Sequence, residues 1–271
     1  MGRGGQGREP IFNVPVATLV LTALIALAHW WRVSLGEAGE IEALVDHGFI
    51  PARAMLLFDR AGTLQGLGEV AAAVGDGVGA GGLRAALAAF IVEQGEARPA
   101  TVLSYAFLHG DLAHLATNLV WLLAFGSALD RRLGAPRYLL LCAAGAVAGA
   151  AAHALLDPLD VAPLVGASAI VAACTGAAVR FAFADGAPLS ASSLPAAVAY
   201  AQPAPPLLAA LSNPRALAFV GVWMAMNLIV GFAAQPLGIS DAPVAWVAHL
   251  GGFAAGLFLF GPLDPVRGAR R

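Results

Sequence analysis

The stretch VGASAIVAACTGAAV, from Val165 to Val179, contains no charged residue and consists almost entirely of small ones. A helix with small residues on several sides is thin, and thin helices pack closely against several neighbours inside a membrane. We therefore expect this stretch to form the central helix of a membrane bundle. Its polar residue Ser168 falls in the first turn, where free backbone N–H groups and the helix dipole favour negative charge.

The composition of the whole chain agrees with a membrane location. Of 271 residues, 59% are hydrophobic and only 12% are charged, and the mean hydropathy is +0.77. A soluble domain carries roughly a quarter of charged residues. The chain is therefore predicted to be an all-α polytopic membrane protein that contacts a lipid bilayer and no nucleic acid. Cys142 and Cys174 lie within apolar runs and are expected to pack as small hydrophobic side chains, with no metal or other cofactor.

Six segments are apolar over about the 20 residues that a helix needs to cross a bilayer. They are residues 11–31, 112–129, 137–156, 164–184, 215–235 and 244–263. The first segment is also compatible with a cleaved signal peptide, since Arg3 and Arg8 precede it. Its length, and its end at the aromatic pair Trp30 and Trp31, favour a retained span.

The arginines outside the longest loop fall on one side of this six-span arrangement, which the positive-inside rule makes cytoplasmic. Both termini are then cytoplasmic, as a tail over residues 1–10 and a basic tail over residues 264–271. The membrane domain covers residues 11–263. Within it, residues 32–111 form an outer loop, and residues 185–214, rich in Pro and Ser, form a cytoplasmic linker. The expected location is a bacterial inner membrane.

The outer loop is too long for a simple connection. Its segments 40–56 and 81–95 have apolar residues at helical spacing, with too few in succession to cross a bilayer. They are predicted to be interfacial helices that lie against the bundle. Between them the sequence GDGVGAGG, residues 75–82, predicts a flexible break.

The second span begins with polar side chains that are costly in hydrocarbon. His114 and Asn118 are four residues apart and share one helical face, and a buried amide must find hydrogen-bond partners. His109 precedes His114 by five residues, whereas histidine ligands of a metal on one helix prefer a spacing of four. A metal site is therefore not favoured, and His109 is interpreted as hydrogen-bonded to backbone at the interface.

The sixth span carries His249, with Gly252 and Gly256 on the same side of the helix. These glycines allow close approach to another thin helix, and the obvious partner is the stretch that begins near Ser168. That contact would bring the imidazole of His249 to the Ser168 hydroxyl. No Asp or Glu within the spans is placed to orient His249, so the residues permit a dyad held by packing rather than a triad.

Such a dyad has a defined chemistry. His249 would accept the Ser168 proton as the hydroxyl attacks a carbonyl, and would return it to the leaving amine. The oxyanion of the tetrahedral intermediate needs donors, which the Ser168 N–H and the Asn118 amide would supply with His114 beside them. These residues predict a serine endopeptidase that acts within the membrane.

The ordered motifs resemble those of the rhomboid intramembrane serine proteases. HGDLAHLATN (109–118), GAS (166–168) and AHLGG (248–252) are similar to the family's His-x4-His-x3-Asn, Gly-x-Ser and Ala-His-x-x-Gly patterns on successive even-numbered spans. The likeness extends to GFIPAR (48–53), FGSALDRRLG (125–134) and WMAMNLIVG (223–231), and covers the chain from about residue 11 to residue 263.

The resemblance implies a six-span bundle and transmembrane segments of other proteins as substrates. It also implies a role for each matching residue: Ser168 as nucleophile, His249 as general base, His114 and Asn118 in oxyanion support, Gly252 and Gly256 in helix packing, and His109 in structure. Two positions depart from the pattern. Ala169 follows the serine where the family usually has glycine, and Ala172 stands where some members have a tyrosine beneath the histidine.

Three other functions account for the sequence less well. A noncatalytic rhomboid-like protein would bind or escort transmembrane clients, but such proteins lose the serine or histidine that this chain keeps. A transporter or channel would show inverted repeats or charged residues at mid-membrane, and neither is seen. A haem- or quinone-binding protein would use His114 and His249 as ligands, which leaves Ser168 and Asn118 without a role.

Overall fold

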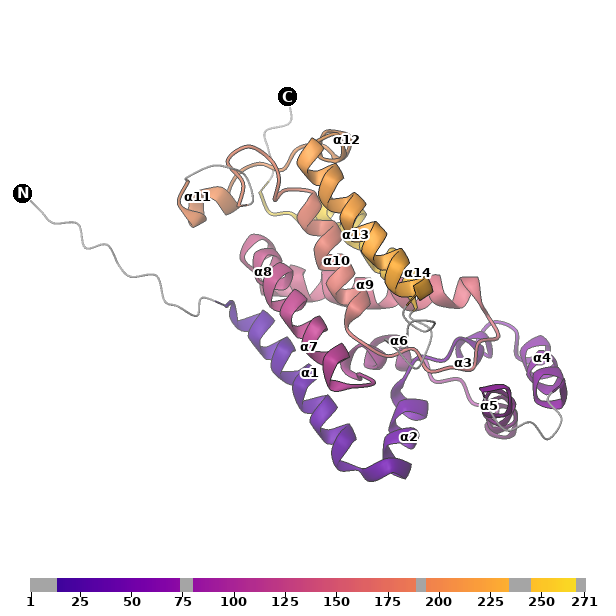
Figure 1. Cartoon of the computed structure of the whole chain (residues 1–271). Helices are drawn as coiled ribbons and strands as arrows, with labels where there is room; N and C mark the ends of the chain where they lie inside the picture. The colour runs from indigo at the N-terminus through magenta and orange to yellow at the C-terminus, as the bar shows by residue number, and fades with distance from the viewer. Residues whose placement is uncertain (1–13, 74–79, 189–193, 234–244, 267–271) are drawn as a thin grey trace, which may run out of the picture.

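A computed structural model describes residues 14–73, 80–188, 194–233 and 245–266, and these residues fold almost entirely into helices (Figure 1). The first part of the described chain comprises α1 (Val16–Ser34), α2 (Gly36–His47), α3 (Pro51–Met55), α4 (Arg60–Ala73), α5 (Ala80–Gln94), α6 (Thr101–Ser104) and the 3-10 turn η1 (Tyr105–Phe107). The remainder comprises α7 (Leu112–Trp121), the π-helical turn η2 (Leu122–Gly126), α8 (Ser127–Leu133), α9 (Ala135–Leu156), α10 (Ser168–Val179), α11 (Ala196–Tyr200), α12 (Leu207–Leu211), α13 (Pro214–Ala233) and α14 (Trp246–Leu263). The prediction of an all-α chain is confirmed, with no strand among the described residues.

Four helices in the described residues are long and apolar enough to cross a membrane. They are α1, the continuous run α7–η2–α8 (Leu112–Leu133), α9 and α14, which coincide with the first, second, third and sixth predicted spans. The apolar part of α13 and the whole of α10 are shorter. The predicted count of six spans therefore exceeds the four that length and composition alone support.

The fourth predicted span, residues 164–184, was too long. Only Ser168–Val179 is helical, and turns follow it. The helix begins after Gly166, whose φ of +118° lies outside the helical region. Near its other end, the Arg180 guanidinium donates a 2.9 Å hydrogen bond to the Leu257 carbonyl of α14. Every residue from Ala169 to Val179 is buried, so neighbouring helices surround α10 and it lies at the centre of the bundle (Figure 1).

The small side chains of α10 and its neighbours bring the helix backbones into direct contact. A Cβ placed on Gly256 of α14 would lie 1.8 Å from the carbonyl oxygen of Ala173. One placed on Gly252 would lie 2.2 Å from the carbonyl oxygen of Ala169. On the α9 side, a Cβ on Gly145 would lie 2.4 Å from the Ala173 Cβ. Helix α10 is thus held between α14 and α9 at a distance that only glycine permits at these positions.

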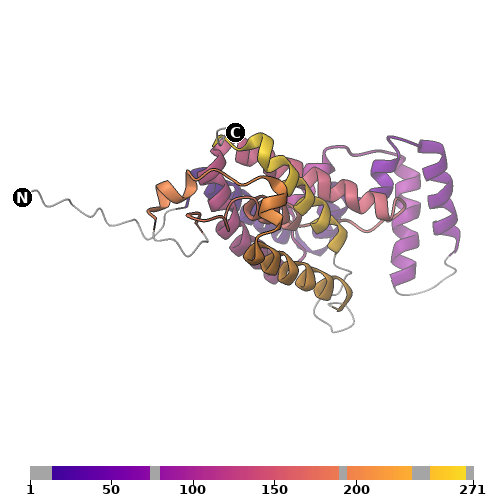
Figure 2. The same ribbon diagram turned by 90° about the horizontal axis from the view of Figure 1, so that it is seen from above.

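The segment between the first two spans is more ordered than its sequence predicted. The predicted helix over 40–56 is two helices, α2 and α3, and the one over 81–95 is α5. Helix α4 was not predicted, and residues 80–82 of the expected break begin α5, while 75–79 lie outside the described residues. Helices α4 and α5 form a hairpin at one end of the molecule (Figure 2), packed through a small core of Leu67, Ala88 and Ile91.

The segment over 185–214 is also more than a simple connection. It contains the short helices α11 and α12, and its backbone is tied to the bundle by Arg132 of α8. The guanidinium of Arg132 donates to the Tyr200 and Gln202 carbonyls, and it pairs with Asp264 at 2.7 Å just after α14. Since both charged side chains are buried, this contact links the ends of α8 and α14 to the segment.

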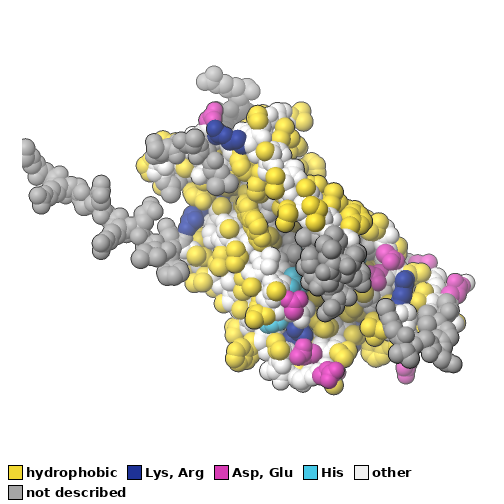
Figure 3. Space-filling view, viewed as in Figure 1, with side chains coloured by type: hydrophobic (Ala, Val, Ile, Leu, Met, Phe, Trp, Pro, Cys, Tyr) yellow, Lys and Arg dark blue, Asp and Glu magenta, His cyan; other side chains and the backbone are white. Residues whose placement is uncertain are grey.

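Much of the outer surface of the helices is apolar (Figure 3). Large hydrophobic side chains are exposed along α1, α9 and α13, among them Leu27, Leu140 and Val222. Exposed apolar surface of this extent suits contact with lipid rather than water. Together with the four long apolar helices, it identifies an integral membrane protein.

Candidate active site

The structure brings Ser168 and His249 together at the N-terminal ends of α10 and α14. Ser168 is the first residue of α10, and His249 lies in the first turn of α14. The Ser168 Oγ and the His249 Nε2 are 2.8 Å apart, a hydrogen-bond distance. The close packing of α10 on α14 at Gly252, one turn further along α14, sets this separation.

The second ring nitrogen of His249 contacts a residue that the sequence analysis did not select. His249 Nδ1 lies 2.6 Å from Oδ1 of Asn227 on α13. The Asn227 side chain is buried, and its Nδ2 donates to the Trp246 carbonyl at 3.3 Å. The sequence predicted that packing alone would hold His249. Instead, both of its ring nitrogens are hydrogen-bonded. In the sequence, Asn227 could have been noticed as an amide in an otherwise apolar span, since a buried amide must find hydrogen-bond partners.

His109 supports the turn that precedes Ser168. Its Nε2 accepts a 3.2 Å hydrogen bond from the Ala167 N–H, and its side chain is fully buried. Burial, together with the neighbouring His114, lowers the pKa of His109 to about 3. The imidazole is therefore neutral, as an acceptor of a backbone N–H must be. Its position agrees with the structural interpretation made from the sequence.

His114 lies beside the same turn. Asp111 caps α7, accepting a 2.7 Å hydrogen bond from the His114 N–H, and the His114 ring packs edge-on against His109. A Cβ placed on Gly166 would lie 2.8 Å from the His114 Nε2 and 3.8 Å from the Ser168 Oγ. The imidazole and the hydroxyl therefore face the same small space, which is open because residue 166 is glycine.

Asn118 is buried one turn further into α7. Its Nδ2 donates a 3.0 Å hydrogen bond to the His114 carbonyl of its own helix. This bond uses one of the two N–H groups of Nδ2 and leaves the second available. Of the two predicted oxyanion donors on α7, the His114 ring borders the space beside Gly166 and Ser168, and Asn118 lies one turn further along the helix.

The arrangement at Ser168 has the parts of a nucleophile site. An imidazole nitrogen contacts the hydroxyl, and the N–H groups in the first turn of α10 have no partner within the helix. Such N–H groups, with the helix dipole behind them, favour a developing negative charge. The site can therefore activate an oxygen nucleophile and bind an oxyanion beside it.

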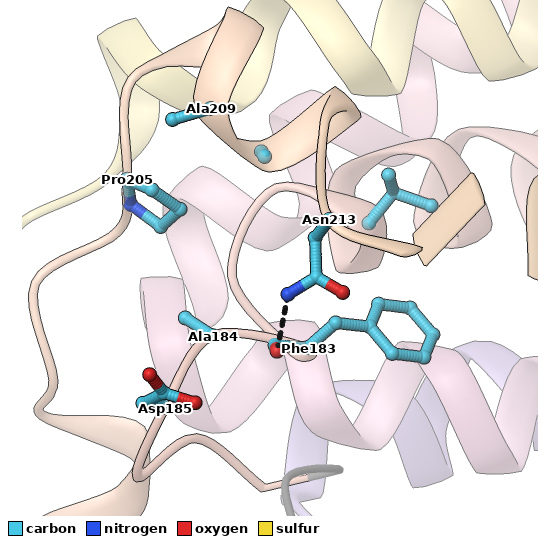
Figure 4. Close-up of a pocket in the computed structure, with 8 residues that line it drawn as sticks. Phe183, Ala184, Asp185, Pro205, Ala209 and Asn213 are labelled. Atoms are coloured by element: carbon cyan, nitrogen blue, oxygen red, sulfur yellow. Dashed lines mark hydrogen bonds between the residues drawn. The ribbon is translucent and has the colours of Figure 1, made fainter. Parts of the chain in front are cut away.

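A cavity of about 210 Å³ lies elsewhere, near the C-terminal end of α10 (Figure 4). Its wall includes Val179, Phe183, Asp185 and Asn213, and the Asn213 amide donates to the Phe183 carbonyl at 3.0 Å. Val179 is eleven residue steps along α10 from Ser168, which corresponds to about 16 Å along the axis. The cavity is thus separate from the serine–histidine pair.

A protein-family model matches the chain, and no individual curated protein does. The match is to the Rhomboid domain over residues 96–263, well over half of the sequence. The matched region holds the second and all later predicted spans, and includes Ser168, Asn227 and His249. The resemblance drawn from the motifs is confirmed: this integral membrane protein belongs to the rhomboid family.

Proposed function

We propose that the protein is an intramembrane serine endopeptidase in which Ser168 is the nucleophile and His249 the general base. The rhomboid family includes intramembrane serine proteases as well as inactive members. The observation that carries the proposal is the 2.8 Å contact between the Ser168 Oγ and the His249 Nε2 at the start of α10. A noncatalytic member would have no need to keep this pair in contact.

The reaction follows from that contact. His249 accepts the hydroxyl proton through Nε2 while the Ser168 Oγ attacks the peptide carbonyl. When the tetrahedral intermediate collapses, the protonated imidazole gives its proton to the leaving amine, and an acyl-enzyme on Ser168 remains. Water, activated by His249 in the same way, then releases the acyl group and restores the serine.

The oxyanion forms next to Ser168, where the first-turn N–H groups of α10 are directed. His114 is the nearest side-chain donor, since its ring borders the space beside Gly166. Asn118 contributes through the second N–H of its Nδ2, since the first is bonded to the His114 carbonyl. His109 holds the turn between them through the Ala167 N–H.

The proposal includes a six-span topology with both termini in the cytoplasm. Helix α10 serves as the fourth span although it has only 12 residues, because its surroundings are protein and not lipid. Helix α13 serves as the fifth. The arginine distribution then places residues 32–111, and the Ser168 end of α10, toward the outer side. There the α2–α5 region lies at the interface, water reaches the serine, and the substrates are transmembrane segments of other membrane proteins.

The test is covalent labelling combined with cleavage. Purified protein in liposomes is given a panel of reporter transmembrane segments that unwind readily, and separately a fluorophosphonate. The proposal predicts cleavage and a phosphonyl adduct that mass spectrometry locates at Ser168, both lost in Ser168→Ala. If the folded wild-type protein cuts no segment and takes no label, the noncatalytic, client-binding function replaces the proposed one.

Gly166→Ala is expected to lower cleavage about 100-fold while the protein remains folded. A Cβ would meet the His114 ring at 2.7 Å, and a φ of +118° strains any L-residue by about 1–3 kcal/mol. Because displacement of a catalytic group by about 1 Å can cost this factor, kcat should carry the loss. Gly110→Ala is the matched control, since nothing lies within 4 Å of its added Cβ. Equal rates for the two variants would contradict the placement of His114.

A further inference from the structure

Asn227 joins α13 to the catalytic histidine through both ends of its amide. The Oδ1 atom lies 2.6 Å from His249 Nδ1, and Nδ2 donates to the Trp246 carbonyl at 3.3 Å. The carbonyl of Trp246 accepts only, so the nitrogen of the amide must face it. The orientation of the amide is therefore decided by its second partner, and the oxygen is left facing His249.

This orientation determines the tautomer of the imidazole. An amide oxygen is an acceptor, so His249 Nδ1 must carry the proton that it donates to Asn227. In the neutral ring, Nε2 is then unprotonated and has its lone pair toward the Ser168 hydroxyl 2.8 Å away. A general base needs this tautomer; the other one would present N–H to the serine and could not accept its proton.

In the part of the chain that the structure describes, few other contacts act on the ring nitrogen that faces α13. Asn227, its hydrogen-bond partner, is buried, with 8% exposure. In free imidazole the two tautomers interconvert readily, and no charged group within the described residues contacts Nδ1 to favour one. The hydrogen bond from His249 Nδ1 to Asn227 is therefore the contact that selects the Nδ1–H tautomer.

We infer that Asn227 is a positioning residue that holds His249 in the Nδ1–H tautomer and aims Nε2 at Ser168. The inference rests on the proposed function, in which His249 is the general base. It assigns to α13 a part in the chemistry that the sequence motifs place on α7, α10 and α14. An amide takes the place that a carboxylate holds in a serine protease triad, and it supplies orientation without burying a charge.

Two substitutions separate this role from a purely structural one. Asn227→Leu fills a similar volume and removes both hydrogen bonds. Asn227→Asp keeps an acceptor oxygen for His249 Nδ1 and loses the donor to the Trp246 carbonyl. If Asn227 positions the histidine, Asn227→Leu lowers kcat about 10- to 100-fold with KM unchanged, whereas Asn227→Asp stays within a few-fold of wild type. If the amide serves only to hold the Trp246 carbonyl, both variants lose activity alike.

A spectroscopic readout keeps the inference testable even where a variant folds poorly. In protein labelled with 15N-histidine, the imidazole shifts report which nitrogen carries the proton, and His249→Ala identifies the signals of His249. In the wild type, His249 should have Nδ1 protonated and Nε2 unprotonated, whereas Asn227→Leu should show a mixture of the two tautomers. Met226→Leu, a change at the exposed neighbouring position, is the matched control and should leave both rate and shifts unchanged.

Failure of the inference about Asn227 can be distinguished from failure of the proposed function. Wild-type activity with no loss in Asn227→Leu, or an unprotonated Nδ1 in the wild type, would overturn the inference and leave the protease intact. Equal loss in the Leu and Asp variants, with the wild-type tautomer kept in both, would also overturn it. Absence of cleavage and labelling in the wild type would instead overturn the proposed function.

Discussion

Ser168→Ala and His249→Ala are each expected to lower the cleavage rate by at least about 10⁴-fold. Either change removes the 2.8 Å contact on which formation of the nucleophile depends. Because the two residues act as one unit, the double variant should be no slower than either single one. The measurement is single-turnover cleavage of a reporter transmembrane segment in liposomes, with the melting temperature of each variant as a check of folding.

Ser104→Ala is the matched control for this experiment. The Ser104 hydroxyl donates to the His47 carbonyl at the end of α2, so its loss should leave the rate within about two-fold of wild type. Additive losses in the double variant would show that the two residues do not act as one unit. Cleavage that survives in folded Ser168→Ala would show that another group is the nucleophile.

Gly256→Ala is expected to destabilise the bundle by about 1–3 kcal/mol or more and to remove cleavage. The added Cβ would lie 1.8 Å from the Ala173 carbonyl oxygen, which is backbone and cannot rotate away. Helices α10 and α14 must therefore separate, and His249 would move from Ser168 because the two helices carry them. Thermal unfolding in detergent and the cleavage rate should both fall.

Gly221→Ala on the neighbouring helix α13 provides the comparison. Nothing lies within 4 Å of its added Cβ, so the change meets no clash. Alanine favours the helix over glycine by about 1 kcal/mol, and this variant should match or slightly exceed wild type in stability. A Gly256→Ala protein as stable and active as Gly221→Ala would mean that the helices do not pack as closely as described.

The main residues of the candidate site could be predicted from the sequence because polar residues in an apolar chain are few. Ser168 and His249 stand out in their spans, and the small residues around Ser168, with Gly252 and Gly256 after His249, indicate which two helices meet. The membrane helices α1, α9 and α14 follow from apolar length in the same way. These inferences depend on local composition and on the helical repeat, both of which can be read along the chain.

Other features depend on residues distant in sequence. Helix α10 has 12 residues, fewer than a bilayer span needs. Protein covers it on every side, so its length need not match the bilayer. Helix α4 has glycines and only moderate hydropathy, and it folds against α5 across a shared core. Arg132 and Asp264, 132 residues apart, pair because the ends of α8 and α14 meet.

Asn227 illustrates most clearly the difference between what the sequence determines and what only the packed structure determines. By itself the sequence determined the helical class, the membrane location, the family and the residue types suited to serine chemistry, because each of these follows from composition or from spacing within one helix. Tertiary structure alone decided which imidazole nitrogen faces the serine, which side chain holds the other nitrogen, and that Asn118 bonds within its own helix. These outcomes depend on distances of about 3 Å between separate helices, and such distances are decided only when the helices pack.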